Sequence, residues 1–255
     1  MKLLFTICGR AGSKGIKNKN IRDFLGKPLP LYSLSAIHLF LKRNLEYDAD
    51  IALNTDSEEL KEIMRAQAIE HIQIVERKSE LAGDLVGKID VINDTLLQME
   101  KRNRCIYDMV IDLDITSPLR TVGDIERLID KKKKSGCDVV FSVAESRRNP
   151  YFNMLIKTEH GYKKVLNSVF TARQQAPEIF DINASLYAYD PDYLRTGKGI
   201  LEGYCEIIQM YDTGILDLDR TNDFELMEVI ADYLYKSKKE FGEIRNFLVY
   251  ENNEM

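Results

Sequence analysis

Residues 2–20 read KLLFTICGRAGSKGIKNKN, and this stretch decides how the rest of the chain is interpreted. The nearly continuous apolar run at 2–8 predicts a strand that is covered on both faces of a sheet. The glycines that follow it allow backbone N–H groups to approach a ligand closely, and the cations Arg10 and Lys19 lie near the two ends of the loop. A loop of this kind after a first strand predicts a phosphate-binding turn.

Strand-like and helix-like segments alternate after this loop. Apolar, β-branched runs predict further strands at 49–56, 72–77, 107–115 and 138–145. Apolar residues at a period of 3.6 predict helices at 31–43, 57–68, 87–102 and 122–134. This order predicts an α/β fold: a mainly parallel, twisted, Rossmann-like sheet with helices on both faces. Ligands bind at the carboxyl ends of the strands in such sheets.

The pattern changes between 146 and 188, where turns and aromatic residues are frequent and no clean helix appears. We interpret this segment as an insert, either a lid or a dimerisation arm, between two parts of one core, 1–145 and 189–255. A long amphipathic helix is predicted at 222–239. The lysine-rich end of the helix at 122–134, followed by Gly136, is typical of a solvated helix terminus, and we assign it no function.

Composition narrows the function classes. The chain has 255 residues, of which 44% are hydrophobic and 30% charged, so it can bury a core and is not a disordered segment. The net charge of -5 argues against a nucleic-acid-binding protein. The four cysteines are far apart, which predicts free thiols in a reducing compartment, the cytoplasm. The apolar run at 2–8 is too short for a signal or membrane-spanning segment.

Five stretches in order resemble one family. The loop at 9–21 is neither a Walker A motif nor G-x-G-x-x-G, and instead resembles the signature of the acylneuraminate cytidylyltransferases, the CMP-sialic acid synthetases and their relatives. The other matching stretches are ERKSELAGD (76–84), TSPLR (116–120), RQQAP (173–177) and LDLDRTNDFELME (216–228). The resemblance extends over about residues 2–235, and five motifs in order are far more specific than one.

The resemblance implies a nucleotidyltransferase fold and the transfer of CMP from CTP to the anomeric hydroxyl of a nonulosonic (sialic-type) acid, with release of pyrophosphate. It further implies Mg²⁺ dependence, a role in surface glycan biosynthesis, and a homodimer in which the insert completes the partner's site. The reaction needs cations around the triphosphate and a metal to orient the attacking hydroxyl. It needs no covalent enzyme intermediate.

The family's functional residues carry over by motif. Phosphate binding falls to Gly9, Arg10, Ala11, Gly12, Ser13 and Lys19, with Arg10 and Lys19 also stabilising the departing pyrophosphate. Base recognition falls to Asn20 and Arg77. The acceptor sugar is expected near Asp114, Thr116, Arg173 and Gln174. The metal ligands are Asp217 and Asp219, hard oxygen donors that share one face of a strand if the segment is extended.

One departure bears on the acceptor. The family usually has Gln where this chain has Asp114, and a carboxylate there would repel an acidic sugar unless a cation or metal intervenes. An aspartate at this strand end also resembles the metal ligand of sugar-1-phosphate nucleotidyltransferases. Two alternatives therefore stay open: a sugar-1-phosphate nucleotidyltransferase that uses GTP or CTP, and a nucleotide-binding module of glycan assembly without turnover. Asp219 could also serve only to introduce the last helix.

Overall fold

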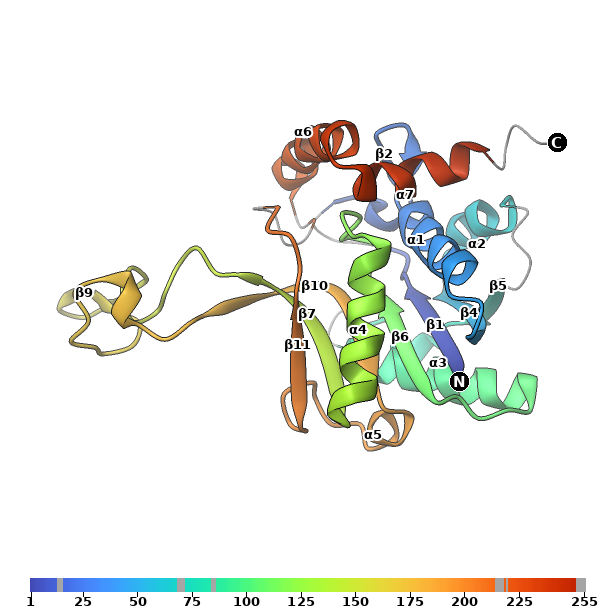
Figure 1. Ribbon diagram of the computed structural model, residues 1–255, viewed down its shortest axis with the longest axis horizontal. Coiled ribbons are helices and arrows are strands. Elements are labelled where there is room, and N and C mark those ends of the chain that lie inside the picture. Colours follow the sequence, from blue (N-terminus) through green and yellow to red (C-terminus); the bar gives the residue numbers. More distant parts are fainter. Residues whose placement is uncertain (13–15, 68–71, 84–85, 214–217, 219, 251–255) are drawn as a thin grey trace.

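A seven-stranded sheet forms the centre of the part of the chain that the structure describes (Figure 1). The structure is a computed structural model that describes residues 1–255 except 13–15, 68–71, 84–85, 214–217, 219 and 251–255. The strands, in their order across the sheet, are β11 (Cys205–Gln209), β7 (Val139–Glu145), β10 (Phe180–Tyr189), β6 (Met109–Leu113), β1 (Lys2–Cys8), β4 (Asp48–Thr55) and β5 (Ile72–Glu76). The paired strands are parallel except for β10, which runs antiparallel to both β6 and β7.

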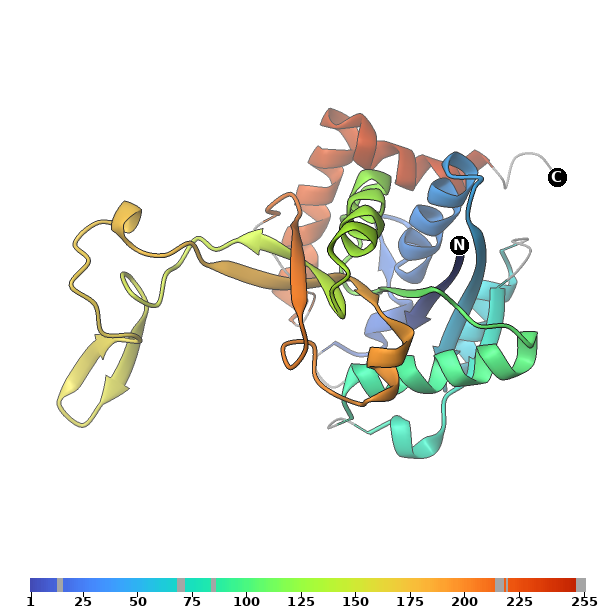
Figure 2. The ribbon, with the colours of Figure 1, turned by 60° about the horizontal axis from the view of Figure 1, so that its bottom comes forward.

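Helices cover both faces of this sheet (Figures 1 and 2). One face packs against α1 (Pro30–Arg43), α2 (Glu58–Arg65), α4 (Val122–Ser135), α6 (Thr221–Ser237) and α7 (Lys239–Tyr250). The other face packs against α3 (Lys88–Asn103) and α5 (Pro191–Arg195). In β1, Leu3, Phe5 and Ile7 face the first core and Leu4 the second. The strand is therefore buried on both faces, and the predicted α/β class is confirmed.

Local signals place the element ends close to the sequence prediction. Helix α4 begins with a capping box in which Thr121 and Asp124 satisfy each other's backbone N–H groups. It ends at Gly136, whose φ of 63° is accessible to glycine at low cost. The lysine-rich run at 130–134 is thus part of a helix end, as predicted. Helix α2 is capped by Ser57, whose hydroxyl accepts a hydrogen bond from Leu60 N.

The long helix predicted at 222–239 is confirmed as α6, which spans Thr221–Ser237, and a second helix that was not predicted follows it. Helix α6 ends at Ser237, and Lys238 is extended, with φ −125° and ψ 112°. Helix α7 then packs beside α6 and α1. A Cβ at Gly242 would lie 2.8 Å from the carbonyl oxygen of Tyr235, so the close approach of the two helices requires glycine there. Strand β11 was not predicted either.

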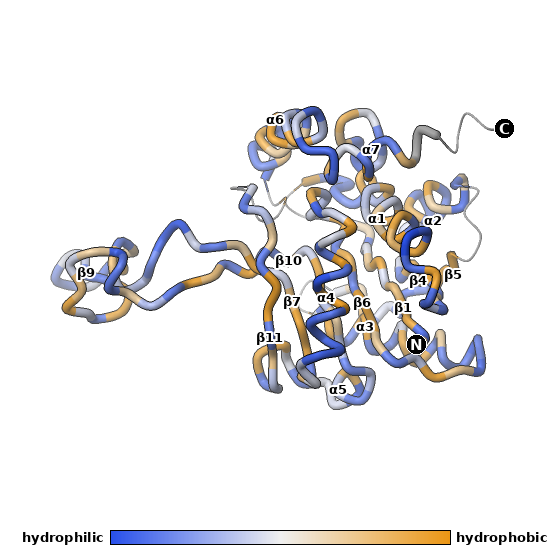
Figure 3. The backbone as a smooth tube through the Cα atoms, in the orientation of Figure 1, coloured by the Kyte–Doolittle hydropathy of each residue, from blue (hydrophilic) through white to orange (hydrophobic). Residues whose placement is uncertain are grey.

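The insert has a different boundary from the predicted 146–188. Its last part, β10, lies between β6 and β7 in the main sheet, so it belongs to the core. The part that projects from the core carries a small hairpin, β8 (Leu155–Thr158) and β9 (Gly161–Lys164) (Figures 1 and 2). We call the projecting segment, 146–179, the arm. Figure 3 shows hydrophobic stretches along it, outside the core.

A second small hairpin, β2 (Asp23–Phe24) and β3 (Lys27–Pro28), follows the glycine-rich loop and leads into α1. Among the described residues, none of the helices combines the length and the apolar character that crossing a membrane requires. The four cysteines, Cys8, Cys105, Cys137 and Cys205, are free. Free thiols agree with the pattern expected from their spacing.

Candidate active site

The topology places the glycine-rich loop at a switch point of the sheet. The chain passes from β1 to β4 and β5 on one side, and then returns to β6 on the other side of β1. Open α/β sheets bind ligands at such a reversal, outside the carboxyl ends of the strands. The loop after β1 and the Asp114–Thr116 segment after β6 both leave the sheet at this edge. The predicted phosphate loop and one predicted acceptor segment are therefore neighbours.

Hydrogen bonds fix the start of the loop to the neighbouring strand. Gly9 N donates to the carbonyl oxygen of Asn54 at 3.1 Å, and Ala11 N donates to Asp56 Oδ1 at 2.8 Å. The side chain of Asn20 closes the loop by donating to the carbonyl oxygen of Arg10 at 3.0 Å. Arg10 and Asn20 are thus held together although they lie at opposite ends of the loop.

A cavity of about 120 Å³ lies inside this loop. Its lining comes from both ends of the loop and from the start of α2: Arg10, Ala11, Gly12, Asn18, Asn20, Ile21, Ser57 and Glu59. Lys19 begins the short 3-10 turn Lys19–Ile21 beside it. The structure therefore brings most of the predicted nucleotide residues to one place, whereas the predicted Ser13 lies outside the described residues.

Gly9 is closely packed under the loop. A Cβ at this position would lie 2.7 Å from the terminal side-chain carbons of Ile115 and Leu60, so a larger residue would require these two side chains to move. Glycine avoids this rearrangement beneath the backbone N–H groups that are predicted to meet a phosphate.

Arg77 lies after β5, on the far side of β4 from the loop. Its Nε donates to Asn54 Oδ1 at 2.8 Å, and the Asn54 amide donates in turn to Thr95 Oγ1 at 2.9 Å. Burial lowers the pKa of Arg77, although the group remains a cation at neutral pH because an arginine starts so high. These contacts do not test whether Arg77 recognises the base, so that role stays a prediction. They also identify Asn54 as a positioning residue that sequence reasoning missed.

Asp114 is compensated by a cation that the sequence did not reveal. Lys88 Nζ lies 2.5 Å from Asp114 Oδ2 and 2.7 Å from Asp112 Oδ2. The other oxygen of Asp114 accepts hydrogen bonds from the Thr116 N–H at 2.9 Å and the Thr116 hydroxyl at 2.8 Å. Predicted residues Asp114 and Thr116 thus interact directly. A carboxylate at position 114 was expected to repel an acidic sugar unless a cation lies nearby. Lys88 is such a cation within the chain.

These contacts set the ionisation of the pair. Burial alone would raise the pKa of Asp114, but Lys88 and the hydrogen bonds from Thr116 outweigh it and lower the pKa to about 2. Burial would likewise lower the pKa of Lys88, and the two aspartates raise it well above its ordinary value instead. Asp114 and Lys88 are therefore both charged across the physiological pH range.

A buried arginine lies beneath the same segment. The Arg120 guanidinium donates to the carbonyl oxygens of Asp114 and Ser117, and to Ser33 Oγ at 2.9 Å. Its burial lowers its pKa to about 10, which still leaves it protonated at neutral pH. Arg120 therefore fixes the backbone of the TSPLR stretch from below, which explains why this motif includes an arginine.

Lys88 could have been suspected from the sequence. It is the first residue of α3, and a cation is unfavourable at a helix N-terminus because of the positive end of the helix dipole. Such a residue needs an anionic partner elsewhere in the fold. The partner could not be identified, because Asp112 lies on β6 and Asp114 directly follows it, and only the fold brings this segment next to Lys88.

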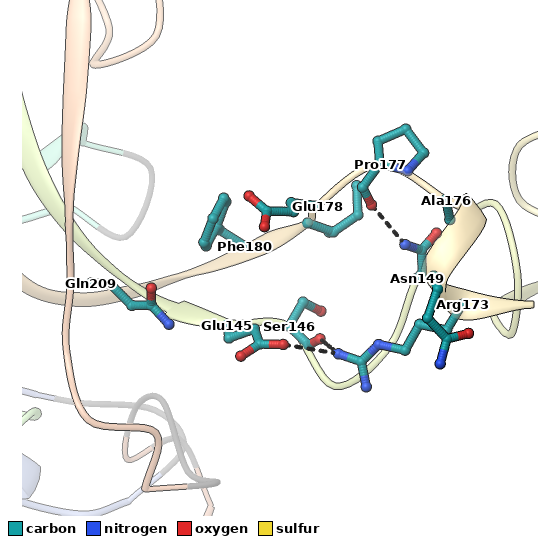
Figure 4. A pocket seen from close by; sticks show the side chains of 11 residues that line it. Glu145, Ser146, Asn149, Arg173, Ala176, Pro177, Glu178, Phe180 and Gln209 are labelled. Atoms are coloured by element: carbon teal, nitrogen blue, oxygen red, sulfur yellow. Dashed lines mark hydrogen bonds and ion pairs between the residues drawn. The ribbon is translucent and has the colours of Figure 1, made fainter.

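The predicted sugar residues of the insert lie elsewhere. Arg173 and Gln174 belong to the 3-10 turn Arg173–Gln175 and line a cavity of about 500 Å³ at the base of the arm. Arg173 donates to the Ser146 carbonyl oxygen at 2.7 Å and lies 3.4 Å from Glu145 Oε1 (Figure 4). Gln209, at the end of β11, also lines this cavity. Among the described residues, this cavity shares no lining residue with the loop cavity.

The predicted metal ligands Asp217 and Asp219 lie outside the described residues. Within the described ranges, no group of three His, Cys, Asp or Glu side chains is arranged to hold a metal ion. The magnesium site therefore remains a prediction from the resemblance. Asp114 offers no comparable ligand set, since both of its carboxylate oxygens already interact with Lys88 and Thr116.

Comparison with known proteins identifies the class of protein to which this fold and loop belong. The sequence model of the cytidylyltransferase family matches residues 4–246, so this chain belongs to that family. The predicted relationship is confirmed. The match includes both strand ends that form the loop edge and the whole of the arm.

Among curated proteins, the chain is similar to post-translational flagellin modification protein B of Campylobacter coli, with 32% identity over 94% of this chain and 99% of that protein. It is 31% identical, over the same shares, to CMP-N,N'-diacetyllegionaminic acid synthase of Campylobacter jejuni. It is 30% identical to the pseudaminic acid cytidylyltransferase of Campylobacter jejuni, over 93% of this chain and 99% of that protein.

Solved structures show the same fold at low identity. CMP:2-keto-3-deoxy-manno-octonic acid synthetase complexed with CTP superposes with a TM-score of 0.61 and 14% identity, covering 91% of this chain and 99% of that one. The 4-diphosphocytidyl-2C-methyl-D-erythritol synthase of Anaerococcus prevotii gives a TM-score of 0.60 and 12% identity over the same shares. These structures confirm the nucleotidyltransferase fold.

Proposed function

We propose that this chain transfers CMP from CTP to the anomeric hydroxyl of a nonulosonic acid and releases pyrophosphate. The observation that carries the proposal is the glycine-rich loop at the switch point, which is hydrogen-bonded to the neighbouring strand and encloses a cavity. The chain that carries this loop matches the cytidylyltransferase family over residues 4–246. The names of the relatives supply the acceptor class, because they specify legionaminic and pseudaminic acid. Both sugars are acidic nonulosonic acids.

In this proposal, the loop holds the triphosphate. Arg10, Lys19 and the loop N–H groups bind the phosphate oxygens and stabilise the charge that develops on pyrophosphate as it leaves. Asn20 and Arg77 recognise the base. The sugar hydroxyl attacks the α-phosphorus in line, so the enzyme's main contribution is orientation and charge stabilisation. A Mg²⁺ ion held by Asp217 and Asp219 would lower the pKa of that hydroxyl.

The residues at the edge argue against a covalent route. Cys8 is the obvious nucleophile because it immediately precedes the loop, but burial and the nearby Asp112 raise the pKa of its thiol well above the ordinary value. The thiol is therefore protonated at neutral pH and is a poor nucleophile. Direct attack by the sugar hydroxyl fits these groups better.

We further propose that the arm binds a second copy of the chain, and that Arg173 and Gln174 of one copy contribute to the partner's acceptor site. Large apolar side chains of the arm are exposed, including Leu155, Tyr162 and Val169. Exposed apolar patches of this kind mark interaction surfaces. A homodimer would also explain how Arg173 and Gln174, which the family resemblance assigns to the acceptor, could reach a sugar bound at the loop edge of the other copy.

The cellular setting belongs to the same proposal. A CMP-activated acidic sugar is a donor for glycan assembly, so we place the reaction in the cytoplasm, upstream of lipopolysaccharide, capsule or other surface glycans. The free cysteines are compatible with a reducing compartment. The name of one relative connects that protein to the post-translational modification of flagellin.

The test is a pyrophosphate-release assay with four nucleoside triphosphates and two panels of acceptors, nonulosonic acids and sugar 1-phosphates. We expect turnover with CTP and a nonulosonic acid. Turnover restricted to sugar 1-phosphates would instead support the first alternative, a sugar-1-phosphate nucleotidyltransferase. CTP binding without turnover on any acceptor would support a non-catalytic module.

A further inference from the structure

Two elements of the proposed nucleotide site share one anchor at the end of β4. The carbonyl oxygen of Asn54 accepts hydrogen bonds from Gly9 N at 3.1 Å and from Arg77 Nη2 at 3.2 Å. The side-chain oxygen of Asn54 accepts from Arg77 Nε at 2.8 Å. Burial and, to a smaller extent, the charge of Arg10 lower the pKa of Arg77, so this guanidinium lies near the cation of the loop. Asn54 therefore fixes both the start of the phosphate loop and the residue that is predicted to recognise the base.

The hydrogen bonds to Asn54 set the orientation of the Arg77 side chain. A guanidinium is planar and its five N–H donors have a fixed geometry, so anchoring Nε and Nη2 also sets the direction of Nη1. Among the described residues, the hydrogen bonds of this guanidinium all lie on its Nε–Nη2 edge. The Nη1 end is directed away from Asn54 and can donate to a ligand.

Thr95, in the middle of α3, holds the Asn54 amide in one orientation. The Thr95 hydroxyl donates to the carbonyl oxygen of Val91 at 2.7 Å, and a hydroxyl has only one proton. The Thr95 oxygen therefore acts as the acceptor toward Asn54, whose amide nitrogen lies 2.9 Å away. Because the N–H2 group of the amide faces Thr95, its oxygen faces Arg77.

These residues interact in the interior of the protein. Asn54 and Thr95 are fully buried, and Arg77 is 9% exposed. Water does not readily replace a lost partner in such surroundings, and an unsatisfied buried donor is costly. Helix α3 packs on β1, β4 and β5, and a fully buried Thr95 does not contact a ligand itself. An effect of Thr95 on nucleotide binding is therefore transmitted through Asn54.

A fixed donor direction bears on the choice between two pyrimidines. Cytosine has two adjacent acceptors, N3 and O2, whereas N3 of uracil carries a proton. A guanidinium N–H that is aimed at this edge is satisfied by cytosine and opposed by a second donor in uracil. A site that leaves a buried polar group unpaired with the wrong ligand discriminates strongly. The discrimination is lost if the guanidinium can turn toward a uracil oxygen instead.

We propose that Thr95 is a positioning residue that acts through Asn54, aims Arg77 at the base, and thereby sets the preference for cytosine over uracil. This inference rests on the proposed function, in which Arg77 recognises the base of CTP. It goes beyond the resemblance, which assigns no role to positions 54 and 95. The chain from Val91 through Thr95 and Asn54 to Arg77 joins the interior of α3 to the nucleotide.

The test compares CTP with UTP in binding as well as in turnover. Dissociation constants of both nucleotides are measured by calorimetry with Mg²⁺, and kcat is measured with a nonulosonic acid at saturating CTP. We expect Thr95→Val to reduce the preference for CTP over UTP about 3–10-fold, as for loss of one hydrogen bond. The kcat at saturating CTP should stay within about twofold, because the contact is the same in the ground and transition states. Thr95→Ser keeps the hydroxyl and should keep the wild-type preference.

The double variant Thr95→Val/Asn54→Asp separates orientation from stability. A carboxylate has two acceptor oxygens and no N–H group, so it can accept from Arg77 in either orientation and needs no acceptor at position 95. Its added charge weakens both nucleotides alike, which makes the ratio of their dissociation constants the relevant readout. We expect the double variant to regain the preference for CTP that Thr95→Val loses. A double variant as unselective as Thr95→Val would overturn the inference.

The matched control is Ser35→Ala. Ser35 is another fully buried helical residue, and its hydroxyl donates to the carbonyl oxygen of Ile244 at 2.5 Å, between α1 and α7. Its loss should lower the melting temperature and leave the ratio of CTP to UTP binding unchanged. An equal change of this ratio in Ser35→Ala and Thr95→Val would show a general effect of destabilisation and would reject the positioning role.

The wild-type chain separates this inference from the proposed function. A wild-type chain that binds CTP no better than UTP would reject both. Selective CTP binding without turnover on any nonulosonic acid would reject the proposed reaction, while the binding measurements would still test Thr95. Turnover with CTP and an unchanged binding ratio in Thr95→Val would reject only the role of Thr95.

Discussion

The loop edge and the arm differ in whether their side chains find partners within the same chain. At the edge, Thr6, Asp112, Lys88, Asp114 and Thr116 form one continuous set of contacts inside a single chain. The arm instead carries a two-stranded hairpin and large exposed apolar side chains, with Val169 92% exposed. An isolated hairpin is marginal in water without further packing. The contacts of the edge lie within one chain, whereas the arm exposes the large apolar side chains that the proposed dimer would cover.

The largest effect is expected at the predicted metal ligands, Asp217 and Asp219. Asp219→Asn should abolish turnover and Asp217→Asn should reduce it severely, because each removes the charge of an oxygen ligand. Asp114→Gln should mainly change acceptor preference, since its carboxylate is engaged by Lys88 and Thr116. Mg²⁺ titrations of the three variants test this. Persistent turnover with an unchanged Mg²⁺ requirement in Asp219→Asn would remove that residue from the metal site, and a strongly raised requirement in Asp114→Gln would place Asp114 there.

The loop cations come next. Arg10→Ala and Lys19→Ala should each reduce kcat/KM at least about 100-fold, or roughly 2.7 kcal/mol, by removing a charge that stabilises the leaving pyrophosphate. The fold should be intact by circular dichroism. Lys17→Ala is the matched control, because Lys17 belongs to the same loop but is exposed and lines no part of the cavity. Near-normal rates in either active-site variant would exclude that residue from phosphate binding.

Much of the edge was predictable because its signals are local. The apolar run of β1, the glycines after it and the helical periods on either side lie within short windows of sequence. These signals gave the α/β class, the phosphate loop and the helix end at Gly136. The structure supports them because burial on both faces of a strand leaves a clear pattern in its composition.

The rest depends on contacts between distant residues. Lys88 pairs with an aspartate 26 positions away, and only the strand order brings them together. Strand β10 was taken for part of the insert because its pairing with β7 is interrupted between Ile182 and Tyr187, where Ala184 has a φ of 52°. Such a bulge breaks the alternation that identifies a strand. The arm cavity around Arg173 had no local signature of this kind.

A smaller effect concerns the stability of the edge and its dependence on pH. The pKa of Asp114 is about 2 in the folded chain, below its ordinary value of 3.8, so ionisation stabilises the fold by about 2 kcal/mol. This contribution is present above about pH 4 and is lost as the pH falls through 2. Urea unfolding should show Asp114→Asn destabilised by about this amount at pH 6, and by progressively less below pH 4.

A surface carboxylate provides the control for this measurement. Asp130→Asn breaks an exposed pair with Lys134 on α4 and should change the free energy of unfolding by less than about 0.5 kcal/mol at either pH. Equal and pH-independent effects of the two substitutions would show that the Asp114–Lys88 pair does not stabilise the edge.

The smallest expected effect tests the arm. Val169→Asp should weaken dimerisation at least about tenfold, because it places a charge in an apolar interface, and Leu155→Asp should act in the same direction. Sedimentation velocity at micromolar concentrations gives the dimer dissociation constant. The control is Leu45→Asp, because Leu45 is a similarly exposed apolar residue that lies outside the arm. If the arm completes the partner's acceptor site, turnover at low enzyme concentration should fall in parallel with dimer content, while CTP binding at the loop edge persists. A wild-type chain that sediments as a monomer would contradict the proposed role of the arm, and the acceptor site would then have to be complete within one chain.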